Sequence, residues 1–359
     1  MSADATKAIA AIRTTPPSVP RRFLSRAFAV LRACIAVVLV LGASAASAQL
    51  LLVVSEGAGV YGDVAKEVAR RVRSVAPQVQ VDTVGASEAP AIDAERLRRY
   101  ALAVTVGLDG ADALISRSQG QATHAPILAL LVPRDRFGEL AATAHAEHDA
   151  RVSAIFIEQP LARQLDLVAL ALPGRSRVGV LLGPSSTRLA RDLDDAARAA
   201  GLDLRQTQAS DPAAVYPALQ RVLVQSDVLL AVPDPVAINA ATIRSVLVAS
   251  HRAGVPVVGF SQALVDAGAL LAVYSTPQQY ARQAAEIALG VLDGSAPLPR
   301  PHYPRYFTVG VNFLAAQAIG LALDDETSLA TALAVREREK DRVRSQSRLP
   351  ARAATGSSP

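Results

Sequence analysis

The sequence predicts an α/β protein with two lobes, each built on a parallel sheet. Short apolar runs alternate with longer segments whose apolar residues recur at helical spacing, from residue 50 to residue 292. The apolar runs are continuous, which is typical of parallel strands that helices cover on both faces. The alternation runs through two successive series, each with the length of one domain of about 120 residues. We therefore expect two Rossmann-like lobes with parallel sheets.

The first series contains short apolar runs that we expect to be strands. They are Leu50–Ser55, Val79–Val84, Ala101–Val106, Pro126–Val132 and Val152–Ile157. The intervening segments have a helical period; residues 63–75, for example, place apolar side chains at 64, 65, 68, 69, 72 and 75. The expected helices are Asp63–Val75, Ala91–Arg99, Ala111–Ser118, Arg134–His145 and Leu161–Leu172.

The second series repeats the pattern with clearer turns, and several of its helices end close to a glycine. The expected strands are Arg177–Leu182, Leu204–Gln208, Val228–Val232, Pro256–Phe260 and Ala269–Tyr274. The expected helices are Thr187–Ala200, Asp211–Val224, Asn239–Arg252, Gln262–Ala267 and Gln278–Leu292. We place the first lobe at residues 49–160 and the second lobe at residues 161–296.

The C-terminal part begins with four prolines between Pro297 and Pro304, which indicate an extended crossing segment. A strand at Tyr306–Asn312 and a helix at Phe313–Leu321 are expected to follow, so that residues 297–323 hold the crossing segment and the closing elements. Residues 324–359 are charged, and we expect a partly disordered tail with one marginal helix. The alternating charges of Arg336–Arg344 are typical of a solvated helix face.

Residues 1–48 have the order of a cleavable secretory signal peptide. Arginines precede an uncharged apolar run, Ala33–Ala43, and small residues then end in Ala46-Ser47-Ala48. This run is shorter than the roughly 20 apolar residues that a membrane-spanning helix needs, although a retained anchor is the alternative. Arg21-Arg22-Phe23-Leu24 is a weak match to a twin-arginine signal, and the arginine inside Leu31–Cys34 argues against lipidation. We expect export to the periplasm with cleavage near Ala48.

Removal of this segment changes the charge and the cysteine content. Residues 1–48 carry 6 of the 37 basic and 1 of the 32 acidic residues, so the remainder carries 31 of each. A neutral chain gives no reason to expect a nucleic-acid partner. Cys34 is the only cysteine, so the mature chain has no disulfide, thiol nucleophile or cysteine metal site. The segment from residue 49 to residue 323 is long enough for an ordinary apolar core.

The second half resembles the substrate-binding proteins of ABC transporters, a family that has the type I periplasmic-binding fold and includes aromatic amino-acid binders. Each matching stretch is weak alone, but together they follow the family's order from Gln164 to Leu321. The stretches are Gln164–Leu167, Leu172-Pro173, Val178–Leu181, Thr187–Gly201, Asp227-Val228, Pro233-Asp234, Gly254–Val257, Val265–Ala269, Arg282–Ala285, Leu292–Gly294, Val311–Phe313 and Ala315–Leu321.

The first half matches the same family poorly. The loops that face ligand in the family read Val106–Ala111, Pro133-Arg134-Asp135 and Ala150–Ala154 in this chain and depart from the family pattern. The resemblance implies a protein that closes two lobes on a small organic solute, such as an amino acid, and delivers it to an inner-membrane ABC permease. The departures leave open an exported accessory or interaction protein, partnered with an envelope receptor, that has lost transport-type ligand binding.

Candidate ligand-binding residues follow the strands, because open parallel sheets bind ligands outside the carboxyl ends of their strands. In the second lobe the segment Gly183–Thr187 can offer a helix start to a carboxylate, or Ser185 and Ser186 can simply cap that helix. Asp234 can accept from a solute or form a turn with Pro235. The complete set is Ser55, Glu56, Asp109 and Glu158 in the first lobe and Ser185, Ser186, Asp234, Ser261 and Tyr274 in the second.

The carboxylates in this set favour a cationic or polyhydroxyl solute over a simple anion. His145 and His148 have a spacing that permits metal binding, but a third ligand is missing, so we expect a solvated helix end and no metal site. Gly57-Ala58-Gly59 lacks the spacing of a phosphate loop, and the sequence contains no G-x-S-x-G motif. We therefore expect a monomeric binding protein that needs no cofactor and is not an enzyme.

Overall fold

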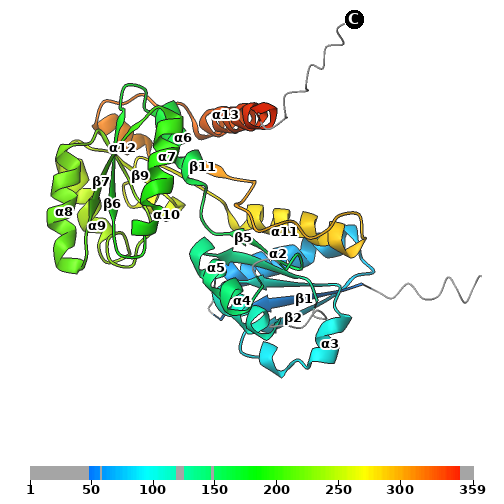
Figure 1. Cartoon of the computed structure of the whole chain (residues 1–359). Coiled ribbons are helices and arrows are strands. Elements are labelled where there is room, and N and C mark those ends of the chain that lie inside the picture. Colours follow the sequence, from blue (N-terminus) through cyan, green and yellow to red (C-terminus); the bar gives the residue numbers. More distant parts are fainter. Residues whose placement is uncertain (1–47, 57–58, 119–124, 147–148, 348–359) are drawn as a thin grey trace, which may run out of the picture. The chain divides into compact units, whose positions relative to one another are not determined.

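The structure, a computed structural model, describes residues 48–56, 59–118, 125–146 and 149–347. These residues form two mainly parallel sheets with helices on both faces, so the predicted fold class is confirmed (Figure 1). The predicted signal peptide lies outside the described residues, apart from Ala48. Within the described ranges, no helix has both the length and the apolar character that a membrane span requires.

The first sheet has five strands in the order β2-β1-β3-β4-β5, and every neighbouring pair is parallel. Its strands are β1 (Gln49–Val54), β2 (Gln80–Gly85), β3 (Leu102–Val106), β4 (Ile127–Val132) and β5 (Val152–Phe156). Its helices are α2 (Val60–Val75), α3 (Ala94–Arg99), α4 (Leu108–Ile115), α5 (Arg134–Thr143) and α11 (Pro277–Leu292), with short 3₁₀ turns at Ala89–Ala91 and Ser116–Ser118.

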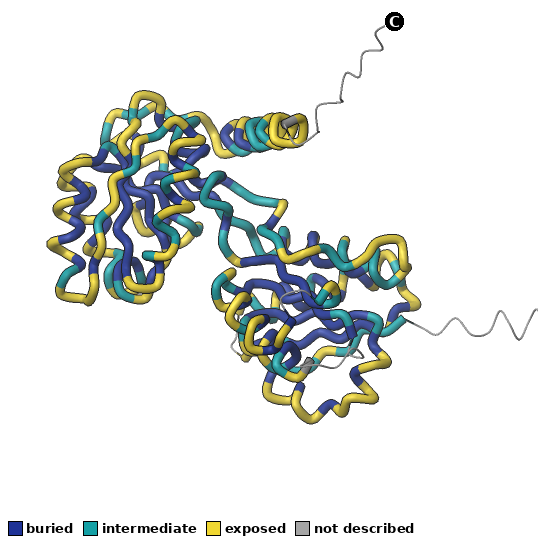
Figure 2. The backbone as a smooth tube through the Cα atoms, viewed as in Figure 1, coloured by how far each residue is buried: buried dark blue, intermediate teal, exposed yellow. Residues whose placement is uncertain are grey.

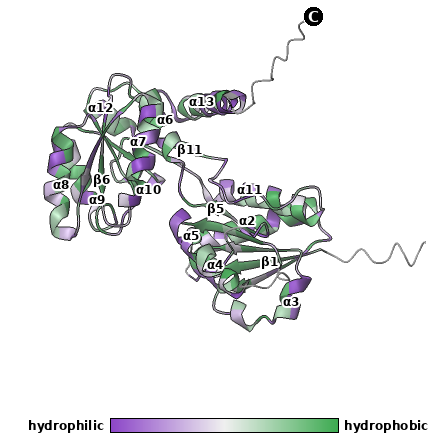
Figure 3. Ribbon diagram, viewed as in Figure 1, coloured by the Kyte–Doolittle hydropathy of each residue, from purple (hydrophilic) through white to green (hydrophobic). Residues whose placement is uncertain are grey.

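The strands β1, β3, β4 and β5 are buried on both faces, as their continuous apolar runs require, whereas β2 at the edge of the first sheet is partly exposed (Figure 2). Apolar residues predominate in the buried strands (Figure 3). Leu50 and Leu52 of β1 lie in a core with the inner faces of α2 and α11. Leu51 and Val53, the intervening residues, lie in a second core with α4 and α5. Successive strand side chains point to opposite faces, so one apolar run supplies both cores.

Helix α11 lies on the first sheet, which differs from the predicted second lobe of residues 161–296. Tyr280, Ala281, Ala284 and Ala288 are buried in the core that α11 shares with α2 and β1. The small residues at 281, 284 and 288 allow a close approach to α2. The helical period predicts that α11 has an apolar face, but it carries no information about which sheet receives that face.

The second sheet has six strands in the order β11-β10-β9-β8-β6-β7. All neighbouring pairs are parallel except β10 with β11. The strands are β6 (Arg177–Leu182), β7 (Asp203–Gln208), β8 (Val228–Leu230), β9 (Val257–Gly259), β10 (Leu271–Tyr274) and β11 (Thr308–Val311). The helices are α6 (Leu161–Ala171), α7 (Ala190–Ala200), α8 (Pro212–Val224), α9 (Ile243–Arg252), α10 (Gln262–Asp266), α12 (Phe313–Ala318) and α13 (Glu326–Ser347), with a 3₁₀ turn at Thr187–Leu189.

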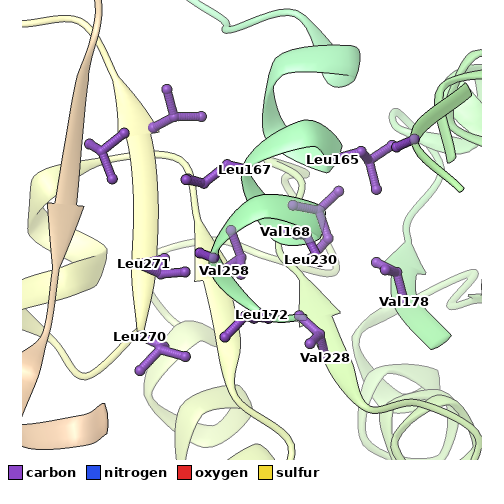
Figure 4. Close-up of a cluster of buried hydrophobic side chains, with 14 of the residues drawn as sticks. Leu165, Leu167, Val168, Leu172, Val178, Val228, Leu230, Val258, Leu270 and Leu271 are labelled. Carbon is purple, nitrogen blue, oxygen red and sulfur yellow. The ribbon is translucent and has the colours of Figure 1, made fainter. Parts of the chain in front are cut away.

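Two cores also cover the faces of the second sheet. On one face, Leu165 and Val168 of α6 pack with Leu230, Val258 and the strands beside them (Figure 4). On the other face, residues of α8, α9 and α10 pack against alternate residues of β6, β8 and β9. The second lobe therefore has the same layered arrangement as the first.

Helix α13 is a long helix docked on the second lobe, which differs from the predicted marginal helix and disordered tail. Leu329 and Leu333 are buried in the core beneath α6 and α7. Further along α13, Arg336 and Lys340 bind the carboxylate of Asp166 on α6. The prediction of a solvated face is therefore wrong for these two cations. Residues 348–359 lie outside the described part of the chain.

Candidate functional site

The carboxyl ends of the parallel strands define one edge of each sheet, and the loops that leave this edge are the candidate binding surfaces. We call the loops after β1, β3, β4 and β5 the first rim. The loops after β6, β8, β9 and β10 are the second rim. Eight of the nine candidate residues are at the ends of these strands or in these loops, and Asp109 is the second residue of α4, the helix that follows β3.

Ser55 organises the loops of the first rim. Its side chain is buried, and its hydroxyl accepts a hydrogen bond of 3.0 Å from the backbone N–H of Gly110. Gly107 packs so closely that a Cβ there would lie 2.7 Å from the Ser55 Cβ, and Gly107 has a φ of +88°. The space and the backbone angle both require glycine at this position. Ser55 thus holds the loop after β1 against the start of α4.

Glu56 and Asp109 are the exposed carboxylates of the first rim. Neither side chain makes a hydrogen bond or an ion pair with another residue that the structure describes. Asp109 is in the first turn of α4, where the helix dipole favours a negative charge. Both side chains are therefore available to a solute.

Glu158 caps helix α5 from the end of β5. Its carboxylate oxygens both lie 3.1 Å from the backbone N–H of Arg134, the first residue of α5. Burial raises the pKa of Glu158, and the hydrogen bond from Arg134 only partly opposes this effect. Glu158 is therefore a helix cap whose ionised form is disfavoured by its surroundings.

Replacing Glu158 with glutamine is expected to stabilise the protein more at pH 7 than at pH 4. A raised pKa means that the folded state holds the proton more tightly than the unfolded state, so wild-type stability falls as the pH rises through this range. Glutamine cannot ionise and still accepts from Arg134. The measurement is the melting temperature of both proteins at each pH.

Glu158→Ala separates the charge from the cap. Alanine removes the acceptor for Arg134, and we expect it to cost about 1 kcal/mol relative to glutamine at either pH. If Glu158→Gln changed the melting temperature by the same amount at pH 4 and at pH 7, the raised pKa of Glu158 would be contradicted.

Asp234 and Ser186 form the centre of the second rim. The carboxylate of Asp234 accepts hydrogen bonds from the backbone N–H of Ser186 at 2.8 Å and from the Ser186 hydroxyl at 2.9 Å. The backbone N–H groups of Val236 and Ala237 donate to its other oxygen. Burial opposes ionisation of Asp234, but these hydrogen bonds outweigh it and hold its pKa below the ordinary value. The loop after β6 thus donates its hydrogen bonds to a carboxylate of the protein itself, that of Asp234. The sequence had allowed a solute carboxylate in this place.

Ser185 is the exposed serine of this loop. Pro184 and Ser185 lie on the surface, and the backbone carbonyl of Ser185 accepts a hydrogen bond from Arg188. The Ser186 hydroxyl also accepts from the backbone N–H of Gly183 at 2.9 Å, so the loop is closed on itself. Its rigid backbone presents the Ser185 side chain outward.

Ser261 and Tyr274 lie at the ends of β9 and β10. Ser261 is the N-cap of α10 and accepts from the backbone N–H of Leu264 at 3.3 Å. The Tyr274 hydroxyl donates to the side-chain oxygen of Gln262, and the ring is only partly buried. Ser261 thus supports a helix start, whereas Tyr274 presents part of its ring to solvent.

Arg163 is an important residue near the rims that the sequence alone does not reveal. This buried side chain of α6 donates to Gln159 at 2.7 Å and to the backbone carbonyl of Pro304 at 2.8 Å. Gln159 in turn donates to Ser275, which donates to the carbonyl of Tyr306. A charged residue inside an amphipathic helix was the available signal, but its partners lie far along the chain. Pro304 is 141 residues away, and Glu337, which is ion-paired with Arg163, is 174 residues away.

A metal centre is not supported within the described ranges, where no cluster of three or more His, Cys, Asp or Glu side chains could hold an ion. Of the histidine pair singled out in the sequence, His145 is described, whereas His148 lies outside the described residues. The rims consist of hydroxyl groups, carboxylates and one aromatic ring. This chemistry suits noncovalent binding of a small polar solute.

Two α/β lobes, each with a polar rim at the carboxyl ends of its parallel strands, are the arrangement of the type I periplasmic-binding fold. The model of the ABC transporter substrate binding protein family matches residues 144–335, more than half of the chain, and the chain belongs to this family. The resemblance predicted from the second half is thereby confirmed. A search of curated proteins found no match.

Solved structures of similar fold come from several bacteria. A Streptococcus pneumonia ABC domain in complex with L-Trp shares 15% identity, with 78% of this chain and 96% of that chain covered and a TM-score of 0.51. A conserved domain protein from Vibrio cholerae shares 20% identity, with the same coverages and a TM-score of 0.51. The ligand-free, open structure of a substrate binding protein with adhesive properties from Clostridium difficile shares 15% identity, again with the same coverages, and has a TM-score of 0.61. At these identities the likeness concerns the fold.

Proposed function

We propose that this chain is the periplasmic solute-binding protein of an ABC-type uptake system, and that it closes its two lobes on a small organic solute such as an amino acid. The observation that carries the proposal is family membership combined with rims whose loops are fixed by internal hydrogen bonds. Preformed loops reduce the entropy lost on binding. The closed form then docks on an inner-membrane permease, and no covalent chemistry is involved.

Within this proposal the nine candidate residues have two kinds of role. Glu56, Asp109, Ser185 and Tyr274 contact the solute, because their side chains are at least partly exposed and do not hold a loop or a helix start in place. Carboxylates on the first rim favour a solute that carries an ammonium or several hydroxyl groups. The remaining residues hold the rim loops and helix starts in place: Ser55, Glu158, Ser186, Asp234 and Ser261.

A thermal-shift panel of amino acids, sugars and carboxylates tests the proposal on the purified, solute-free protein. A solute that binds only the folded state raises its stability by about 2.7 kcal/mol at a concentration of 100 times Kd. The L-Trp complex of the Streptococcus pneumonia protein makes aromatic amino acids a sensible first set. The double variant Glu56→Gln/Asp109→Asn should lower the melting temperature of the free protein only slightly, through the loss of the Asp109 charge at the start of α4, and should lose most of the shift.

The opposite outcome would favour the other candidate, an accessory protein partnered with an envelope receptor. If no solute raises the melting temperature, and none is recovered from the protein after denaturation, the solute-binding proposal fails. A shift that the double variant fully retains would leave solute binding intact but would reject the assigned contacts of Glu56 and Asp109.

A further inference from the structure

Helices α8 and α9 of the second lobe form a surface groove of about 450 Å³ that the proposed function does not use. Tyr216 and Gln220 of α8 and Arg244, Ser245, Val248 and Arg252 of α9 line this groove, which we call the α8–α9 groove. Positions 216 and 220, and positions 244, 248 and 252, repeat every four residues, so each set follows one helix face. The opposite faces of the two helices fill the core.

Large apolar side chains are exposed in and beside the α8–α9 groove. Tyr216 is 59% exposed, Val248 is 44% exposed, and Val224 at the end of α8 is 83% exposed. Val224 extends the spacing of positions 216 and 220 by one further turn. Exposed apolar side chains that gather along a groove, and are not scattered singly, are typical of interaction sites.

The charge around this groove has one sign. Arg221, Arg244 and Arg252 are exposed, and none of them makes a hydrogen bond or an ion pair with a residue in the described ranges. The segments Pro212–Val224 and Ile243–Arg252 contain no Asp or Glu.

The acids that flank α8 in sequence are both engaged. Asp211 accepts from the backbone at the start of α8, and Asp227 is ion-paired with Arg177. On other helices of this protein, by contrast, arginines pair with acids three or four residues away, as Arg198 does with Asp194. The α8–α9 groove thus keeps an uncompensated positive charge.

We propose that the α8–α9 groove docks an acidic amphipathic segment of a partner protein. The guanidinium groups of Arg244 and Arg252 would bind carboxylates, and Tyr216 and Val248 would receive apolar side chains of the same segment. Tyr and Arg are the residue types that contribute most at protein interfaces. The groove lies between two helices, and its lining mixes the apolar surfaces of Tyr216 and Val248 with polar and cationic side chains. A single amphipathic segment fits this mixture better than the broad surface of a bilayer does.

The spacing of the two arginines defines the probe. They lie eight residues apart on α9, a rise of about 12 Å, which two acids seven or eight residues apart on a helical peptide would match. The probe is a fluorescently labelled 18-residue peptide, a length of about five helical turns, with Glu at this spacing and Leu on the adjoining face. A second peptide with Lys in place of Glu, and vesicles of phosphatidylglycerol, complete the set.

Fluorescence anisotropy should show saturable binding of the acidic peptide and none of the lysine peptide. Arg244→Glu/Arg252→Glu should weaken binding at least tenfold, whereas Arg98→Glu/Arg99→Glu on α3, exposed arginines with the same change of net charge, should change it less than twofold. Tyr216→Ala should weaken binding without a change of charge. The solute response of each variant should stay that of the wild type, which separates this proposal from the proposed function.

Three results would overturn the proposal. If the acidic peptide does not bind, the groove is not a docking site for such a segment. If both double variants weaken its binding equally, the binding is not specific to the groove. Vesicle binding that depends on Arg244 and Arg252, without binding of the peptide, would assign the surface to an anionic membrane.

Discussion

Replacing Gly183 with alanine is expected to lower the free energy of unfolding by about 3 kcal/mol. A Cβ at this position would lie 2.7 Å from one carboxylate oxygen of Asp234 and closer still to the other. The carboxylate cannot move away cheaply, because Ser186, Val236 and Ala237 all donate hydrogen bonds to it. Chemical denaturation would measure the loss, and thermal denaturation should show a fall of roughly 6 to 12 °C in melting temperature.

Two further variants show whether the clash with Asp234 is the cause. Gly138 of α5 is exposed and has open space around its Cα, so Gly138→Ala should be neutral or stabilising. Gly183→Ala/Asp234→Ala should be no less stable than Asp234→Ala alone, because the clashing group is gone. If the two substitutions were additive, the clash would not explain the loss.

The bond between Asp234 and Ser186 also shows what the sequence could not predict at the candidate site. Both residues were candidates because each follows a strand, and position after a strand is visible in sequence. Their hydrogen bond joins residues 48 positions apart. From the sequence, a helix cap was as good an interpretation of Ser186 as a solute contact, and a turn was as good an interpretation of Asp234. The local sequence pattern identifies which residues lie on the rim. Whether such a residue holds a loop in place or contacts a ligand depends on packing between distant parts of the chain.

The fold itself was largely predictable, because the two series of apolar strands and amphipathic helices are local signals. The predicted strand Leu50–Ser55, for example, corresponds to β1 at Gln49–Val54. The elements that the sequence misplaced are α11 and α13. The period of α11 predicts a buried face but not the sheet that buries it.

Helix α13 was predicted only as a marginal helix, and its docking on the second lobe was missed for a different reason. Its buried face continues from Leu329 and Leu333 to Arg336 and Lys340, so the side of the helix that contacts the protein is apolar at one end and charged at the other. From the sequence alone, arginine and lysine side chains in a helix are interpreted as solvated unless their partner is known. The partner, Asp166, lies 170 residues before Arg336. The family match ends at residue 335, just before the charged part of α13.

Replacing Asp166 with alanine is expected to cost about 3 kcal/mol of stability and to loosen the charged half of α13, which the ion pair of Glu337 with Arg163 still ties to α6. Asp166 is 1% exposed and accepts from Arg336 at 2.8 Å and from Lys340 at 2.5 Å. Without the carboxylate, two partly buried cations lie against α6 with no counter-charge. Hydrogen exchange should become faster in residues 336–347 and stay slow at Leu333, which the apolar core still holds.

The triple variant Asp166→Ala/Arg336→Ala/Lys340→Ala shows whether uncompensated charge causes the loss of stability in Asp166→Ala. If uncompensated charge is the main cost, the triple variant should be more stable than Asp166→Ala, because neither cation remains. Glu139→Ala removes an exposed partner of Arg136 and should cost less than about 1 kcal/mol. A triple variant less stable than Asp166→Ala would mean that the methylene groups of Arg336 and Lys340, packed along α6, contribute more to docking than the ion pairs do. In either case α13 is part of the folded second lobe and not an appended tail, because its first half lies in the same core as α6 and β11.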